Sequence, residues 1–337
     1  MHQRIKIGQI GIGHNHAAEK MNTLRRFPDI FEVVGVVEED PVWFQKRSIL
    51  EAYRGLKWMT EEELLSTPGL QAVAVETDGK DLVPTALRCI GAGKHIHLDK
   101  PGGENMALFR TLMSKAKEAD LTVQLGYMYR YNAAIRFCKE AVKKGVLGHI
   151  FEIDAVMSRY DGEEYREWLM NFRAGAMYIF AGHLIDLIVS ILGKPERITS
   201  FPEKTRPDGL VDNGFAVMEY PGGCVATVRT AVVEVEGMKR RNFIVCGDRG
   251  TVTIQPLEPP IAYLTLLEPF ENWAAGRQEI PLLPPEGRYD EHMKEFAAIV
   301  AGEIENPYPP EHELLVQRCL LEACGYPLQK EDIISSR

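Results

Sequence analysis

The chain has 337 residues, 45% of them hydrophobic and 26% charged, which is the composition of a globular protein and not of a disordered or fibrous one. Because a single hydrophobic core stops growing at about 250–300 residues, this length favours two domains. The formal net charge of −9 argues against a nucleic-acid partner, since binding to a phosphate backbone needs a basic face.

Short apolar runs alternate with amphipathic segments over residues 1–125. The runs are rich in β-branched residues and predict buried strands at 5–10, 32–38, 72–77, 95–98 and 122–127. The segments between them predict helices near 16–27, 41–53, 60–66, 81–92 and 104–119. Alternating strands and helices indicate an α/β domain, a doubly wound parallel sheet with helices on both faces.

The pattern changes in residues 126–337, which we expect to form a second, α+β domain. A helix is predicted at about 133–144 and a mostly buried helix at 174–193. Hairpins are predicted around Pro221–Gly223 and around Asp248–Gly250. These features indicate a large, mostly antiparallel sheet with one face on helices and the other open to solvent or to a partner subunit.

The cellular context is also predicted from composition. The six cysteines show no CxxC pairing, and several lie within apolar runs, which indicates free buried thiols in a reducing compartment. No apolar run approaches the roughly 20 residues of a bilayer span, and the first residues lack a signal-peptide pattern. We therefore expect a cytoplasmic protein with no membrane partner.

A glycine turn follows the first predicted strand and predicts a dinucleotide site. Gly11 permits the tight turn and Gly13 lets a pyrophosphate approach, while His14 and Asn15 are expected beside that pyrophosphate. Glu38, at the end of the second strand, can bind the ribose hydroxyls and repel a 2′-phosphate, which favours NAD over NADP. The alternative is that the acidic residues near position 38 only cap the next helix.

Histidines near this turn and on the fourth strand raise the question of a metal. His16 stands where a third glycine is usual, so we expect the first helix to be shifted outward or to begin differently. His14 and His16 are two residues apart at a helix entry, where side chains are expected to diverge. His95, His97 and Asp99 share one strand face, but the strand is expected to be covered on both faces. We predict no metal site.

Four segments, taken in order, resemble the Gfo/Idh/MocA oxidoreductases, the family of glucose–fructose oxidoreductase and inositol dehydrogenase. They are "GKHIHLDKP" (93–101), "GYMYRYNAAI" (126–135), "GHLIDLIVSILG" (182–193) and "CGDRGTVTI" (246–254). In the first, Asp99 stands where the family usually has glutamate. The resemblance implies an N-terminal Rossmann domain over 1–125 and a substrate-binding and oligomerisation domain over 126–337.

The resemblance also implies a chemistry. It implies a nicotinamide cofactor, a sugar, polyol or related hydroxy compound as substrate, and a homodimer or homotetramer formed through the C-terminal sheet. Lys100 matches the catalytic lysine and Pro101 the proline after it, often preceded by a cis bond. Burial beside a cationic nicotinamide disfavours the ammonium form of Lys100, which suits an acid/base. His183 matches the second catalytic position, and Asp186 either shares its cleft or orients its imidazole.

Further site residues are predicted by position. The predicted cofactor-binding residues, besides the glycine turn and Glu38, are Thr77, Asp99, Lys100 and Pro101. The predicted substrate residues are Tyr127, Arg130, Asn132, Arg159, Trp168 and Asp186. For Arg130 the alternative is an interdomain salt bridge, and for the aromatic residues it is the hydrophobic core.

One departure from the family pattern bears on mechanism. Many family dehydrogenases have an aspartate four residues before the histidine, where this chain has Ile179. Tyr178, Asp186, Arg159 or Asp161 are candidates to supply the missing group. The leading hypothesis is an NAD-dependent oxidoreductase; the alternatives are NAD-assisted glycoside cleavage and a cofactor-binding sensor without turnover.

Overall fold

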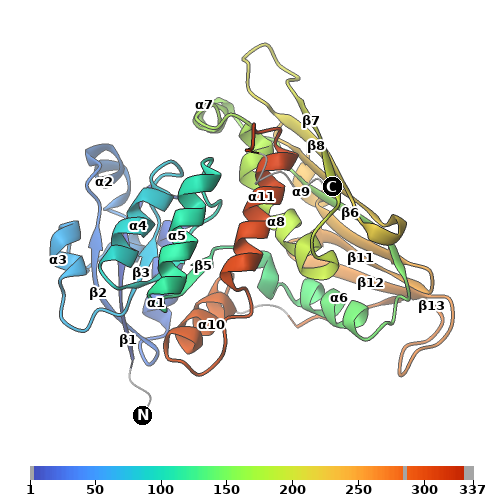
Figure 1. Cartoon of the computed structure of the whole chain (residues 1–337), viewed down its shortest axis with the longest axis horizontal. Coiled ribbons are helices and arrows are strands. Elements are labelled where there is room, and N and C mark those ends of the chain that lie inside the picture. The colour runs from blue at the N-terminus through green and yellow to red at the C-terminus, as the bar shows by residue number, and fades with distance from the viewer. Residues whose placement is uncertain (1–3, 284–286, 330–337) are drawn as a thin grey trace. The chain divides into compact units, whose positions relative to one another are not determined.

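The computed structural model describes residues 4–283 and 287–329, which form two compact units (Figure 1). The first unit runs to Met128 and also includes a later segment that ends at Leu314. The second begins at Tyr129 and takes up the chain again at Leu315. The chain therefore returns to its first unit after building most of the second.

The first unit is built on a five-stranded sheet in the order β2-β1-β3-β4-β5, and every strand pair is parallel. The strands are β1 (Ile5–Ile10), β2 (Phe31–Val37), β3 (Ala72–Val75), β4 (His95–Leu98) and β5 (Val123–Leu125). The connecting helices are α1 (Ala17–Arg26), α2 (Pro41–Arg47), α3 (Glu61–Leu65), α4 (Leu82–Gly91) and α5 (Met106–Glu118), with a 3₁₀ turn at Glu51–Tyr53. The predicted parallel α/β domain is confirmed.

Differences from prediction are local. The helix expected over 41–53 ends at Arg47, and a separate 3₁₀ turn covers Glu51–Tyr53. His16 occupies the N-cap of α1, yet its side chain makes no capping hydrogen bond. The helix thus begins without the usual side-chain cap, and the His16 ring is free to bond elsewhere.

Helix α10 (Asp290–Val300) belongs to the first unit, although the predicted boundary placed it in the second domain. The Arg26 Nη1 atom lies 2.8 Å from both carboxylate oxygens of Asp290. The His97 ring on β4 lies 4.7 Å from the His292 ring and 5.7 Å from the Phe296 ring. These contacts join segments about two hundred residues apart, so local sequence patterns could not reveal them.

The second unit contains an eight-stranded sheet in the order β13-β12-β11-β10-β6-β9-β8-β7, in which only the β6–β9 pair is parallel. Its strands are β6 (Ile150–Ser158), β7 (Arg197–Glu203), β8 (Asn213–Glu219), β9 (Val225–Ala231), β10 (Asn242–Gly247), β11 (Gly250–Leu257), β12 (Pro260–Leu266) and β13 (Gly276–Glu279). Its other elements are α6 (Ala133–Lys143), α7 (Glu163–Leu169), α8 (Gly175–Leu192), α9 (Gly237–Arg240) and 3₁₀ turns at Met128–Tyr131 and Pro221–Gly223. Helix α11 (Pro310–Ala323) begins in the segment of the first unit and ends in the second. The predicted large, mostly antiparallel sheet is confirmed.

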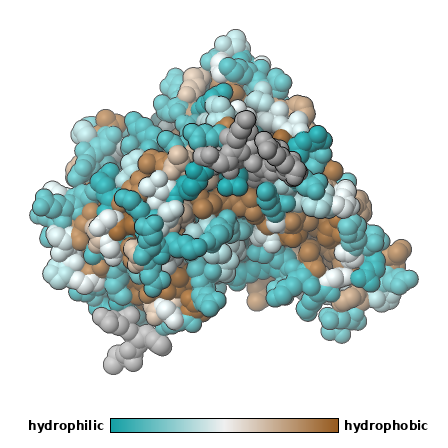
Figure 2. All heavy atoms as spheres, viewed as in Figure 1, coloured by the Kyte–Doolittle hydropathy of each residue, from teal (hydrophilic) through white to brown (hydrophobic). Residues whose placement is uncertain are grey.

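One face of this sheet is covered by helices, chiefly α8 against β9, β6 and β8 (Figure 1). Buried and half-buried residues alternate along β8, as expected for a strand with one face in the core. By length and composition α8 could also cross a membrane, but 83% of its apolar window is buried inside the protein, as in a core helix. Most of the molecular surface seen in Figure 2 is hydrophilic, interrupted by small apolar areas.

Candidate functional site

The glycine turn after β1 has a backbone that only glycine can adopt without strain. Gly11 has φ +89°, and a Cβ atom there would lie 2.4 Å from the backbone nitrogen of Thr77. At Gly13 a Cβ would lie 3.0 Å from the Trp43 ring. Glycine at both positions therefore lets the turn pack closely against Thr77 and Trp43 at the carboxyl end of the sheet, where α/β proteins bind nucleotides.

The Arg47 side chain, which sequence analysis did not single out, holds this turn in place. Its Nη1 atom donates to the backbone oxygens of Ile12 (3.0 Å) and His14 (2.6 Å). Its Nη2 atom donates to Asn15 Oδ1 at 3.0 Å. With three acceptors on one guanidinium, the turn is rigid before any ligand arrives.

The sequence left open whether the acidic residues near position 38 serve the cofactor site or cap the next helix, and the structure gives one role to Glu38 and the other to Asp40. The backbone nitrogen of Ile12 donates to Glu38 Oε2 at 2.7 Å, so Glu38 contacts the glycine turn itself. Asp40 caps α2 by accepting from the Val42 nitrogen at 2.8 Å. Burial raises the pKa of Glu38, and the neighbouring carboxylates of Asp40 and Glu39 add to the rise. An acidic residue at the turn and an acidic helix cap are thus both present.

A solvent-open cavity of about 200 Å³ lies beside this turn. Its lining is dominated by carboxylates, and it includes the predicted cofactor residues Gly11, Glu38 and Thr77. The charged lining residues are Glu38, Glu39, Asp40, Glu61, Asp78, Asp81, Lys80 and Arg88. Arg88 donates to both oxygens of Glu61, at 2.5 and 2.8 Å, so part of its charge is already compensated. The cavity therefore favours hydroxyl groups over further negative charge.

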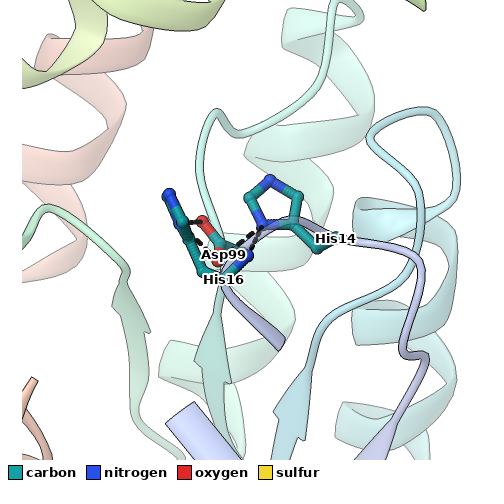
Figure 3. Close-up of side chains that lie close together, drawn as sticks. All are labelled: His14, His16 and Asp99. Atoms are coloured by element: carbon teal, nitrogen blue, oxygen red, sulfur yellow. Dashed lines mark hydrogen bonds and ion pairs between the residues drawn. The ribbon is translucent and has the colours of Figure 1, made fainter. Parts of the chain in front are cut away.

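On the other side of the turn, the carboxylate of Asp99 is the centre of a buried polar cluster (Figure 3). His14 Nδ1 lies 2.9 Å and His16 Nδ1 3.1 Å from Asp99 Oδ2. The prediction that these two histidines diverge is therefore wrong. Both precede the first helical residue, Ala17, so the periodicity of the helix does not govern where their rings point.

Lys20 and Glu76 complete this cluster, and both side chains are fully buried. Lys20 Nζ lies 2.7 Å from Glu76 Oε1 and 2.7 Å from Asp99 Oδ2. Burial disfavours the ammonium form, but the two carboxylates outweigh it and raise the pKa of Lys20. Burial also raises the pKa of Glu76, which the nearby charge of Asp99 reinforces and that of Lys20 opposes.

Burial and nearby charges also set the ionisation of Asp99, His14 and His16. Burial would raise the pKa of Asp99, but the His14, Lys20 and His16 donors hold it well below its usual range. Burial lowers the pKa of His14 and lowers that of His16 to about 3, against the opposing effect of Asp99. At neutral pH both imidazoles are neutral and the Asp99 carboxylate is ionised.

Lys100 follows Asp99 directly at the carboxyl end of β4 and is 4% exposed. Its backbone nitrogen donates to Asp99 Oδ1 at 2.7 Å, and the Lys100–Pro101 peptide is cis, as the resemblance implied. His95 and His97, which lie earlier on β4, do not belong to the group of possible metal ligands around Asp99. His95 Nδ1 accepts from the Thr122 nitrogen at 3.1 Å, and His97 lies against His292.

In the second unit, His183 lies on α8 and is 5% exposed, with the Tyr129 ring edge-on at 5.3 Å. Ile179, one turn earlier, is also buried. Asp186 accepts two bonds from Arg130, at 2.9 and 2.6 Å, and both side chains are fully buried. This ion pair joins two residues of the second unit, and so it is not the interdomain bridge considered for Arg130.

The other predicted substrate residues have local partners. Asn132 caps α6 by accepting from the Ala134 nitrogen, and its amide donates to the Leu257 oxygen at 2.9 Å. Arg159 forms an ion pair with Asp161. Trp168 packs between Tyr165 and Phe172, with ring centroids 5.2 and 5.0 Å away. Tyr127 is buried in the first unit.

Two family profiles match the chain and together cover both units. Residues 5–127 match the oxidoreductase family with an NAD-binding Rossmann fold, and residues 135–253 match the GFO/IDH/MocA C-terminal domain. The chain belongs to the Gfo/Idh/MocA oxidoreductases. As a family member it is a dehydrogenase-type enzyme with a nicotinamide-binding Rossmann domain, and the tight glycine turn at Gly11, between β1 and α1, fits such a domain.

Individual relatives are distant but extend over much of the chain. The uncharacterised oxidoreductase YdgJ of Escherichia coli is 24% identical over 77% of this chain and 79% of its own. Myo-inositol 2-dehydrogenase of Thermotoga maritima is 22% identical over 77% of this chain and 78% of its own. A putative NADPH-dependent oxidoreductase from Desulfitobacterium hafniense shares the fold, with a TM-score of 0.80 at 18% identity over 96% of each chain.

The cluster residues Lys20 and Glu76 were missed by sequence analysis, although each left a signal. Lys20 lies on the same face of α1 as Ala17, Met21 and Leu24, all buried, so its position in an apolar stripe predicts burial. Glu76 ends an otherwise apolar strand. Because burying a charge is costly unless it is paired, a lysine and a glutamate that are both predicted to be buried in one domain are expected to be partners.

Proposed function

We propose that this enzyme transfers a hydride between NAD and a carbon that bears a hydroxyl group in a sugar, a polyol or a related compound. The observation that carries the cofactor preference is the contact between Glu38 and the glycine turn, at the edge of a cavity rich in carboxylates. A 2′-phosphate would meet uncompensated negative charge there, whereas ribose hydroxyls would find acceptors. The name of the inositol dehydrogenase relative supports the polyol substrate class.

In this proposal the chain supplies positioning and proton transfer. Nicotinamide, when bound, accepts or gives the hydride. Gly11, Gly13, His14 and Asn15 would hold the pyrophosphate, and Thr77, Asp99 and Pro101 would line the path of the cofactor. Lys100 Nζ would take the proton from the substrate hydroxyl, or return it in the reverse direction.

For residues of the second unit, the proposed roles are taken from the matching positions in the family. His183 would orient the substrate hydroxyl or share in the proton transfer, with Tyr127, Arg159 and Trp168 as substrate contacts. Arg130 and Asp186 form a buried ion pair, which suits support of α8 better than direct contact with substrate. For the same reason Asn132, which caps α6, supports the site from outside it.

A screen of sugars and polyols with NAD⁺, followed by NADH absorbance at 340 nm, tests this function. We expect turnover with at least one polyol, and a loss of about a hundredfold or more in kcat for Lys100→Met, the scale of general acid–base catalysis. Lys294→Met, which removes a surface lysine of the first unit outside the cofactor cavity, serves as the control for charge alone. Cofactor binding without turnover across the panel would support the sensor alternative that Ile179 suggests.

We also propose that the open face of the eight-stranded sheet forms a homodimer or homotetramer in the cytoplasm. Two large apolar side chains on strands of this face are exposed: Phe201 (46%) on β7 and Ile261 (42%) on β12. Exposed apolar side chains on an uncovered sheet face are compatible with a subunit interface. Analytical ultracentrifugation tests this proposal, and a monomer at micromolar concentration would overturn it.

A further inference from the structure

We propose that His14, His16 and Asp99 form a binding site for a divalent first-row transition-metal ion, with Glu76 as a fourth ligand. This proposal goes beyond the oxidoreductase function and does not rest on it. Imidazole nitrogen and carboxylate oxygen are donors that Zn²⁺, Fe²⁺ and Co²⁺ share. Among residues 4–283 and 287–329, this is the only group of three or more such side chains whose ligand atoms converge, all within 4.8 Å.

The first argument is crowding at one oxygen atom. Asp99 Oδ2 faces His14 Nδ1 at 2.9 Å, His16 Nδ1 at 3.1 Å and Lys20 Nζ at 2.7 Å. A carboxylate oxygen offers about two lone-pair positions, which the bonds with Lys20 and His16 fill, while His14 Nδ1 accepts from the His16 backbone nitrogen at 3.3 Å. Both imidazole Nδ1 atoms turn toward the Asp99 carboxylate, as Figure 3 shows, and the ligand atoms of the three residues lie within 4.8 Å of one another, close enough to share a cation.

The second, independent argument is the carboxylate of Glu76. Its Oε1 atom accepts from Lys20 at 2.7 Å, but within the described parts of the chain Oε2 has no hydrogen-bond partner although the side chain is fully buried. Oε2 lies 4.0 Å from His14 Nδ1, on the side of the cluster. A buried carboxylate oxygen without a partner is costly, and a cation within reach would satisfy it.

The third argument concerns Lys20 and charge. Lys20 bonds to both carboxylates, and hydrogen bonds to the carboxylates of a metal site from outside orient the ligands. Asp99 keeps an ionised carboxylate in a buried environment, and a cation bound there would add to the compensation that Lys20 supplies.

The position of the site gives it a structural consequence. His14 and His16 belong to the glycine turn, whereas Asp99 ends β4 immediately before Lys100. An ion shared by these residues would join the cofactor turn to the main chain of the candidate catalytic lysine. His16 is 19% exposed at its side chain and gives the ion a route from solvent.

The test measures metal content and affinity, and requires no substrate. Full-length protein is stripped with a chelator, dialysed against Zn²⁺ and analysed by elemental mass spectrometry, and Co²⁺ is titrated by visible absorption. We expect one ion per chain in the wild type. We expect His16→Ala to weaken binding about tenfold or more. The loss of a residue that only supports a ligand already has an effect of about this size, and His16 is proposed as a ligand itself.

Two further variants make the result decisive. His149→Ala removes an exposed histidine of the second unit and should bind the ion as the wild type does. Glu76→Gln should weaken binding while the Lys20 contact at Oε1 is kept, and circular dichroism checks that each variant is folded. The proposal is overturned if the wild type retains well under one ion per chain, or if His16→Ala binds as tightly as the wild type.

Discussion

Each unit contains a buried carboxylate that is compensated by charged neighbours, and the two arrangements differ. In the second unit, two nitrogens of Arg130 donate to the two separate oxygens of Asp186. In the first unit, three side-chain nitrogens converge on one oxygen of Asp99, whereas Glu76 Oε2 has no hydrogen-bond partner among the described residues. A carboxylate that is bonded at both oxygens is largely satisfied, while an unevenly shared carboxylate retains capacity to bind a ligand.

The Arg130–Asp186 pair should show the largest effect when one partner is removed. Arg130→Met removes two charged hydrogen bonds from the buried Asp186 carboxylate, and breaking a buried ion pair costs about 3–5 kcal/mol of unfolding free energy. Urea denaturation followed by circular dichroism measures the loss. The double variant Arg130→Met with Asp186→Leu should recover most of it, and a double variant as unstable as the single one would contradict the assignment.

The Asp99 cluster should respond less strongly, and its response should depend on pH. Lys20→Met leaves two carboxylates together, at a cost of about 3 kcal/mol at pH 8. The folded-state pKa of Glu76 is already raised, and it rises further without Lys20. When the pKa of a carboxyl group is higher in the folded than in the unfolded state, the free energy of unfolding falls as the pH rises above the unfolded-state pKa. The variant should therefore be less impaired at pH 5 than at pH 8.

Denaturation at both pH values checks this prediction against a matched control. Lys294→Met removes a lysine of the same unit that forms a surface-exposed ion pair with Glu291, and it should cost little at either pH. A loss for Lys20→Met that is equal at pH 5 and pH 8 would mean that Glu76 does not titrate in the folded protein.

The smallest predicted effect on stability lies in the glycine turn, where the effect on binding is large. Gly11→Ala places a Cβ 2.4 Å from the Thr77 nitrogen, whereas Gly93→Ala, also at positive φ, meets no atom within 4 Å. Gly93→Ala should cost about 1 kcal/mol for the left-handed conformation alone, and Gly11→Ala about 2 kcal/mol or more. Only Gly11→Ala should abolish cofactor binding by calorimetry; equal binding by both variants would place the cofactor elsewhere.

The sequence predicted the architecture well because hydrophobic periodicity is local. Runs such as "AVAV" in β3 and the nearly continuous apolar stretch of α8 need no distant information to be read as buried elements. The turn at Gly11 was predicted for the same reason, since a strand followed by glycine and a helix restricts the backbone.

What the sequence could not supply depends on contacts between distant segments. Arg26 and Asp290 are 264 residues apart, so the return of α10 to the first unit was missed. The convergence of His14 and His16 on Asp99 depends on a turn whose side-chain directions no helical or strand period describes. Lys20 was passed over because a lysine in a helix usually faces solvent, and here two buried carboxylates retain it.

The central claim is that the first unit binds NAD through the glycine turn and Glu38. Isothermal titration of the wild-type chain with NAD⁺ and with NADP⁺ tests it most directly. We predict that NAD⁺ binds with one site per chain and at least about tenfold more tightly than NADP⁺, because the carboxylates around Glu38 repel a 2′-phosphate. Tighter binding of NADP⁺, or no binding of either dinucleotide, would contradict this account.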